Sequence, residues 1–118
     1  MAFAYDRLTE ITTIAASAAA VYTNAASTTT YIRLIIIHNG NTTAEAVKLY
    51  NVPNNGAAVG TAATANEMFA PTGGLAAGED YYLEFPVPGI ILEDTNDTIQ
   101  GTTTTAAKVT IQIYGGTE

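Results

Sequence analysis

The sequence predicts a single all-β domain, an antiparallel β-sandwich or jelly-roll-like fold of about seven to eight strands. Short runs rich in β-branched and aromatic residues recur at spacings of about 8–12 residues, separated by turn residues such as Gly, Pro and Asn. Several runs alternate apolar and polar residues, the pattern of a strand with one buried face. A chain of 118 residues is long enough for one such core and too short for two.

The N-terminal segment, residues 1–27, is expected to supply the first strands, near residues 9–14 and 18–23. Its alanine-rich part would also suit a short helix, but the surrounding threonines and the missing helix caps favour strands. An extended arm lying over a neighbouring subunit is the alternative for this segment. Residues 28–118 then form the body of the sandwich.

The central strand is predicted at residues 31–38, the longest nearly unbroken apolar run, which ends at a turn formed by Asn39 and Gly40. Strict alternation places one set of side chains in the core (Ile32, Leu34 and Ile36) and the other set on the opposite face (Tyr31, Arg33, Ile35 and Ile37). Because both sets are largely apolar, a second layer is expected over the outer one. A chain of this length has little material for a third layer, which favours a neighbouring subunit.

The strand at residues 44–51 is expected to form a hairpin with the central strand, with Val47 and Leu49 inward and with Lys48 and Tyr50 outward. Residues 54–74 form a long connection. Its Met68 and Phe69 are expected to hold it against the end of the sandwich or against a partner. Strands at residues 80–85, 90–92, 98–105 and 108–114 complete the fold.

Three of the four basic residues fall on the predicted outward sides of strands. If those strands share a sheet, the outer face combines cations with apolar and aromatic side chains, and arginine and tyrosine are enriched in protein interfaces. The alternative is an ordinary exposed sheet face. The candidate interface residues are Tyr31, Arg33, Ile35, Ile37, Lys48, Tyr50, Met68, Phe69 and Tyr114.

The charge balance limits the classes of partner. The net charge is −7 with only four basic residues, too few for a patch that neutralises nucleic-acid phosphates or binds anionic lipid. No apolar run reaches the ~18–20 residues of a membrane span, and residues 1–10 lack the pattern of a signal peptide. We therefore expect synthesis in the cytoplasm, with neither nucleic acid nor membrane as a direct partner. The absence of cysteine excludes disulfides and thiolate metal sites.

No arrangement of residues predicts catalysis. His38 is the only histidine, and Ser17 and Ser27 are the only serines that it could activate. A histidine at a strand end, held by a neighbouring polar group, is the more ordinary interpretation. No catalytic or cofactor-binding residue is assigned, and the protein is expected not to be an enzyme.

A calcium site is the one metal site that the sequence suggests, at Asp94, Asn96 and Asp97, because Ca²⁺ takes several oxygen ligands. The spacing imitates the start of an EF-hand loop. However, Ile99 stands where that loop needs glycine, and Thr105 stands where it needs glutamate. Asp and Asn are ordinary turn residues, so no metal is assigned.

Six segments carry a resemblance to a known class of proteins: TYIRLIIIHN (30–39), VKLY (47–50), LAAGE (75–79), GIIL (89–92), DTIQG (97–101) and KVTIQIYG (108–115). Together they resemble the small β-sandwich structural proteins of tailed bacteriophages. The resemblance covers residues 28–116, and its motifs reflect the fold and not a chemical activity.

The resemblance implies a non-enzymatic virion protein, a capsid decoration or cement protein that stabilises the shell. Such proteins are commonly homo-oligomers, with trimers frequent, and they contact the major capsid protein or another virion protein. They carry no catalytic residues to transfer to this chain. The alternative role is a neck, tail or fibre component that binds a receptor or a carbohydrate. The expected location is the virion.

Overall fold

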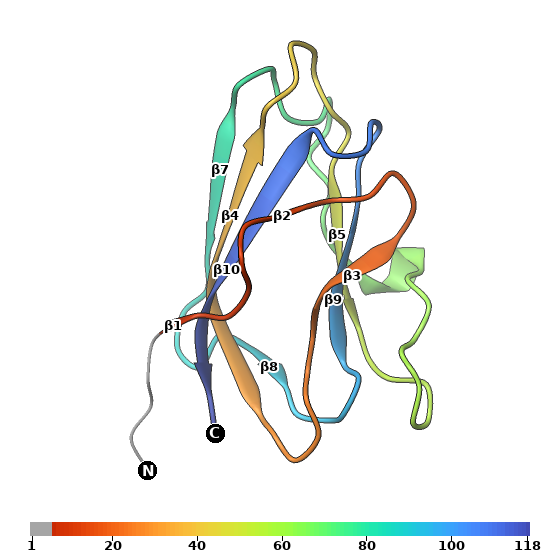
Figure 1. The fold of residues 1–118 in the computed structure, drawn as a ribbon, viewed down its shortest axis with the longest axis vertical. Coiled ribbons are helices and arrows are strands. Elements are labelled where there is room, and N and C mark those ends of the chain that lie inside the picture. Colours follow the sequence, from red (N-terminus) through yellow and green to blue (C-terminus); the bar gives the residue numbers. More distant parts are fainter. Residues whose placement is uncertain (1–5) are drawn as a thin grey trace.

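The computed structural model describes residues 6–118, which form a sandwich of two antiparallel sheets (Figure 1). In sheet A the strand order is β1-β10-β4-β7, with β2 also on β10 and β8 also on β4; sheet B has the order β3-β9-β5-β6. The predicted fold class is confirmed. The strands of sheet A are β1 (Asp6–Arg7), β2 (Thr12–Thr13), β4 (Thr30–Asn39), β7 (Asp80–Glu84), β8 (Ile90–Leu92) and β10 (Val109–Thr117). Those of sheet B are β3 (Ala19–Thr23), β5 (Lys48–Val52), β6 (Glu67–Phe69) and β9 (Thr98–Thr102), and one 3-10 turn, η1 (Thr64–Asn66), precedes β6.

The N-terminal segment belongs to the sandwich from residue 6 onwards. Strands β1 and β2 pair with β10, and the chain then crosses to sheet B, where β3 pairs with β9. Ile14, at the crossing, is fully buried in the core. Residues 6–23 therefore form the first strands of the sandwich, the first of the two alternatives for this segment. Residues 1–5 of the predicted segment lie outside the described residues.

The predicted hairpin between the central strand and its successor is wrong. Strand β4 lies in sheet A, whereas β5 lies in sheet B, paired with β9 and β6. The connection crosses between the sheets because Glu45, within it, exchanges backbone hydrogen bonds of 2.9 Å with Leu75 instead of continuing a turn. Val47 and Leu49 are buried as expected.

A β-bulge in β4 changes which side chains face the core. Leu34 pairs with Tyr114, but the next pair along β10 is Gly115 with Ile32, so Arg33 is an extra residue in β4. One extra residue reverses the alternation on one side of the bulge relative to the other.

The predicted faces of the central strand are therefore only partly right. Ile32 is buried as expected, but Ile35 and Ile37 are also fully buried in the intrachain core. Their assignment to an interface between subunits is wrong. Leu34 and Ile36, predicted as core, are half-buried on the outer side of sheet A.

Glycines on both sides of β4 accommodate the bulge. A Cβ atom on Gly115 would lie 1.9 Å from the carbonyl oxygen of Tyr31, and one on Gly89 would lie 2.1 Å from that of Ile32. Strand β10 and the turn before β8 thus approach β4 more closely than a side chain would allow. Gly89 also has a φ of 89°, which favours glycine.

On the side of β4 away from β10, the neighbouring strand changes at the bulge. β7 pairs with residues 34–38 of β4 and β8 pairs with residues 30–32. At the junction, the backbone N–H of Phe85 donates to the carbonyl oxygen of Arg33 at 2.9 Å. The side-chain Nε of Arg33 donates in return to the carbonyl oxygen of Phe85 at 3.1 Å. These two bonds tie the bulge to the loop that joins β7 to β8.

One hydrophobic core lies between the sheets. Its buried residues are Ile14, Ile32, Ile35, Ile37, Val47, Leu49, Leu75, Leu92, Ile99, Val109, Ile111 and Ile113. At the side where the edge strands β6 and β7 lie, the rings of Phe69 and Tyr81 pack with centroids 4.9 Å apart. Met68 and Phe69 are half-buried against the core. They therefore hold the long connection against its own sandwich, the first of the two roles predicted for them.

Glu45 is a buried carboxylate that the protein satisfies internally. It is 1% exposed, and its two oxygens accept hydrogen bonds of 2.8 Å from the N–H of Thr105 and from the side-chain amide of Asn41. Burial by itself raises the pKa of this carboxyl. The hydrogen bonds from Thr105, Asn41 and the backbone of Thr104 outweigh it, and the pKa lies below its usual value. Glu45 therefore stays ionised while it fixes the crossing loop.

The bulge can be tested by truncating adjacent isoleucines. We expect Ile35→Ala to lower the free energy of unfolding by about 2–5 kcal/mol, because it leaves a cavity in the core. Ile36→Ala should cost less than Ile35→Ala, because the side chain of Ile36 is only partly buried, on the outer side of sheet A. Urea denaturation of both variants measures the two costs. Equal costs, or a larger cost for Ile36→Ala, would contradict the bulged register.

Glu45 should make stability depend on pH in a defined direction. Because its pKa is lower in the folded state than in the unfolded state, its contribution is complete above the unfolded pKa and is lost as the pH falls through the folded pKa. At about pH 7, Glu45→Gln should destabilise the protein by about 1–3 kcal/mol, since the amide nitrogen of glutamine must face one of the two donors, the Thr105 N–H or the Asn41 amide. Urea denaturation should show the difference in free energy of unfolding between the two proteins narrowing towards about pH 3. A difference that stays constant or widens would contradict this role of Glu45.

Candidate functional site

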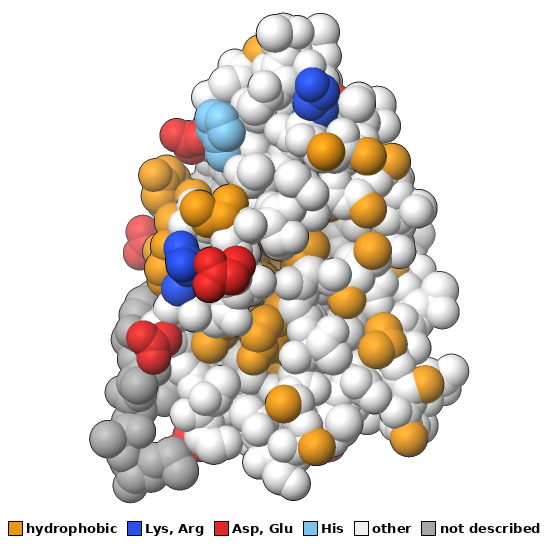
Figure 2. All heavy atoms as spheres, in the orientation of Figure 1, with side chains coloured by type: hydrophobic (Ala, Val, Ile, Leu, Met, Phe, Trp, Pro, Cys, Tyr) orange, Lys and Arg blue, Asp and Glu red, His pale blue; other side chains and the backbone are white. Residues whose placement is uncertain are grey.

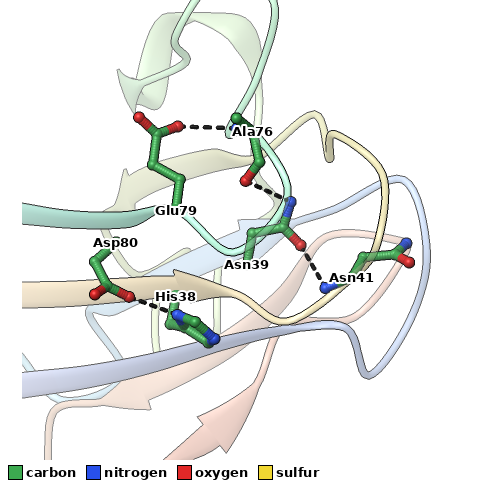
Figure 3. A network of polar contacts seen from close by, with 6 residues as sticks. All are labelled: His38, Asn39, Asn41, Ala76, Glu79 and Asp80. Carbon is green, nitrogen blue, oxygen red and sulfur yellow. Dashed lines mark hydrogen bonds and ion pairs between the residues drawn. The ribbon is translucent and has the colours of Figure 1, made fainter.

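His38 and Asp80 form the closest approach to a reactive pair. They are cross-strand neighbours on β4 and β7, with Nδ1 of His38 2.5 Å from Oδ1 of Asp80 (Figure 3). Both side chains are about half exposed. Ser27 precedes β4, whereas His38 lies near the far end of that ten-residue strand, roughly 25 Å away at the usual rise per residue. The pair therefore ties β7 to β4. Ser27 lies too far from His38 for the histidine to activate its hydroxyl.

The neighbouring polar network in Figure 3 holds loops together. The side-chain amide nitrogen of the buried Asn39 lies within 3.1 Å of the carbonyl oxygens of Thr43, Leu75 and Ala76. Its side-chain oxygen accepts a hydrogen bond of 2.9 Å from the N–H of Asn41. All four contacts lie within the protein, so this network is an anchor for the loops at the end of β4.

Two of the candidate calcium ligands, Asn96 and Asp97, make hydrogen bonds within the protein. The carboxylate oxygens of Asp97 accept hydrogen bonds from the backbone N–H groups of Asn54 at 2.9 Å and of Asp94 at 3.0 Å. The side-chain amide of Asn96 donates to the carbonyl oxygen of Ala57 at 2.7 Å. Within residues 6–118, no group of three or more His, Cys, Asp and Glu is placed to hold a metal ion. Asn96 and Asp97 thus tie their turn to the connection between β5 and β6.

The outer side of sheet B is covered in part by its own chain. The connection between β5 and β6 crosses it, and the side-chain amide of Gln100 donates to the carbonyl oxygen of Gly60 at 2.9 Å. Val52 and Gln100, on the outer side of this sheet, are buried there. Lys48 lies beside this cover and is exposed, with its Nζ 3.7 Å from a carboxylate oxygen of Glu67. The chain therefore covers the part of sheet B around Val52 and Gln100 itself.

The outer side of sheet A keeps apolar surface open to solvent. Exposed fractions reach 59% for Tyr82 and 42% for Ile91. In Figure 2, apolar side chains gather along the left margin, on the side where Figure 1 draws β4, β7 and β10. We call this surface the outer apolar face; it is formed by Tyr31, Leu34, Ile36, Tyr82, Ile91 and Tyr114.

Cross-strand pairing makes the outer apolar face continuous. Leu34 pairs with Tyr114 on one side, and Ile36 pairs with Tyr82 on the other. Side chains directly opposite each other in an antiparallel sheet have Cβ atoms about 4.5–5.5 Å apart, close enough to pack. Beyond the bulge, Tyr31 pairs with Ile91 and extends the surface along the sheet.

A small hollow lies at the bulged end of this face. It has a volume of about 210 Å³ and is lined by Tyr31, Arg33, Val87, Pro88 and Glu118. The phenol of Tyr31 donates to the carboxylate of Glu118. This hydrogen bond, followed by burial and by the negative charges of Glu118 and Glu93, raises the pKa of Tyr31 above its usual value. The hollow is smaller than the ~300–1,000 Å³ of typical small-molecule sites and suits a single side chain of a partner.

The structure brings together only part of the predicted interface. Tyr31, Arg33 and Tyr114 lie on the outer side of sheet A, whereas Lys48 and Tyr50 lie on sheet B. Sequence reasoning missed Leu34, Ile36 and Ile91 as members of the face. The alternation of residues 80–84 does place Tyr82 outward. For Leu34 and Ile36, the available signal was the glycine pair at the end of β10, which marks the close approach at the bulge.

Comparisons with known proteins leave the function to be argued from this geometry. No family model, no curated protein and no solved structure matches the chain. Among the described residues there is no helix of the length and apolarity that crossing a membrane requires.

Proposed function

We propose that the protein is a non-enzymatic structural subunit that joins a larger assembly through the outer apolar face. The observation that supports this most is the difference between the two sheets. On the outer side of sheet B, the connection between β5 and β6 buries Val52 and Gln100, whereas the outer side of sheet A keeps Tyr82 and Ile91 substantially exposed. Continuous exposed apolar surface with a polar rim is typical of contact sites between proteins.

The composition of the face suits a protein partner. Tyrosine and arginine are common where binding energy concentrates, and this surface combines Tyr31, Tyr82 and Tyr114 with Arg33 at its margin. The guanidinium of Arg33 is partly held by the carbonyl oxygen of Phe85, so less side-chain entropy is lost on binding. Covering the face would supply the second layer that this sheet lacks.

The specific assembly that we propose is a bacteriophage virion, in which the protein decorates the capsid shell as a homo-oligomer, a trimer by preference. Contacts with other copies and with the major capsid protein would cover the face. The resemblance of residues 28–116 to phage β-sandwich proteins supports this assignment. A net charge of −7 is consistent with a position away from packaged nucleic acid.

A neck, tail or fibre component with a receptor- or carbohydrate-binding role is the second candidate. The observation that favours it is the hollow beside Tyr31, which offers an aromatic ring, a guanidinium and a carboxylate. Its volume of about 210 Å³ is small for a glycan, so this candidate ranks below subunit contacts. A glycan array on which the protein binds nothing would remove it.

Placing a charge in the face should separate assembly from folding. We expect Ile36→Asp to remain folded, because the side chain is half-exposed, and to shift the protein from oligomer to monomer, because the carboxylate would be buried in the contact. Sedimentation velocity measures the assembly state, and circular dichroism checks the fold. The matched control is Val59→Asp, an exposed apolar residue on the connection that covers sheet B.

The control variant should assemble like the unmodified protein. A protein that is monomeric at all accessible concentrations, or an Ile36→Asp variant that assembles normally, would contradict a contact between copies through this face. The virion assignment is tested separately by antibody labelling of purified parent particles. It fails if the protein is absent from them.

A further inference from the structure

Strand β7 is an edge strand whose outward backbone groups can be identified. In the described residues it pairs with β4 alone. The carbonyl oxygen of Glu79 accepts from the N–H of Asn39, and the N–H of Phe85 donates to Arg33, both at 2.9 Å. The backbone N–H and C=O groups of the odd-numbered residues of this segment therefore point towards β4. Because hydrogen-bonding direction alternates along an antiparallel strand, the residues between them direct N–H and C=O groups away from the sheet.

Those outward residues are Asp80, Tyr82 and Glu84, and all three have exposed side chains. Their side chains share the outer side of sheet A, because Tyr82 pairs with Ile36 and Glu84 pairs with Leu34. A strand that added to β7 would thus meet an acidic, an aromatic and another acidic side chain in order. Residues directly opposite one another on the same face interact most strongly.

We infer that the β7 edge binds an extended segment of a different protein, one that carries Lys or Arg at two positions four residues apart, with an apolar residue midway between them. Backbone hydrogen bonds to Asp80, Tyr82 and Glu84 would supply affinity. The carboxylate of Glu84 and the second oxygen of the Asp80 carboxylate, whose Oδ1 contacts His38, would select the basic side chains. The occupant differs in kind from this chain. The four basic residues of this protein, Arg7, Arg33, Lys48 and Lys108, lie far apart in the sequence and provide no such segment.

Self-pairing of two copies through this edge is unfavourable for the same reason. If two β7 strands paired antiparallel about Tyr82, Asp80 of each copy would lie opposite Glu84 of the other. Like charges directly opposite each other destabilise a sheet, and this repulsion would occur twice. Acidic residues on the edge thus oppose open-ended stacking of identical chains while remaining compatible with a basic strand.

The β7 edge shares Tyr82 with the outer apolar face, but strand addition at this edge does not depend on assembly through that face. The probe for the test is a short synthetic peptide in which two lysines four residues apart flank a central valine, with threonine at the intervening positions. The control peptides replace lysine by glutamate, or group the lysines in one run. Fluorescence anisotropy measures affinity. Amide hydrogen exchange followed by NMR locates the bound strand.

The peptide with two lysines flanking a central valine should bind and slow the exchange of the Tyr82 and Glu84 amides, and added salt should weaken its binding. The glutamate peptide should not bind. Tyr82→Pro removes an outward N–H without removing a bond to β4, so edge positions of this kind tolerate proline. The Tyr82→Ala variant loses the ring but keeps the N–H. The Tyr82→Pro variant should bind the peptide about tenfold more weakly than Tyr82→Ala does.

Several results would overturn the inference: no binding of the basic peptide, equal binding of the grouped-lysine peptide, or equal affinities for Tyr82→Pro and Tyr82→Ala. If Tyr82→Pro fails to fold, amide exchange in the unmodified protein decides, because unchanged exchange at Tyr82 and Glu84 with saturating peptide excludes strand addition. Binding of the peptide by folded Ile36→Asp separates this inference from the proposed function.

Discussion

The extra residue in the central strand β4 decides which of its side chains lie in the core between the sheets. Arg33 has no partner in β10, and this single insertion sets which isoleucines lie between the sheets. Ile32 on one side of the bulge and Ile35 and Ile37 on the other can then all be buried, although strict alternation would separate them. Without the extra residue, strict alternation would place either Ile32 or the pair Ile35 and Ile37 on the outer side of sheet A and not in the core.

The same bulge leaves sheet A with an apolar outer side. Leu34 and Ile36 must face outward once Ile35 and Ile37 face inward, and Tyr82 and Tyr114 lie beside them. On sheet B, the connection between β5 and β6 covers part of the outer side, with the side chain of Gln100 bound to the carbonyl oxygen of Gly60. In the described part of the chain, the outer side of sheet A has no such cover over Tyr82 and Ile91, and this difference is the observation on which the proposed role in an assembly rests.

Sequence reasoning succeeded where alternation was clear and failed where it was not. In β10, Val109, Ile111 and Ile113 alternate with polar residues, so both the strand and its faces could be predicted. In β4, three consecutive isoleucines fit either phase, and only pairing with Gly115 decides between them. The sheet change after β4 was also hidden, because it depends on the distant pairing of Glu45 with Leu75. Strand β6 is too short for a periodic signal.

Methyl NMR of the isoleucines with a soluble paramagnetic agent, recorded over a dilution series, shows which side chains of β4 are buried and which of them meet another copy. The methyl groups of Ile35 and Ile37 should be protected from the agent at every concentration. The methyl group of Ile36 should be accessible in the dilute monomer and become protected as the protein assembles. Accessible Ile35 and Ile37 with a protected Ile36 in the monomer would contradict the bulged register, and an Ile36 accessible at all concentrations would contradict burial of this face between copies.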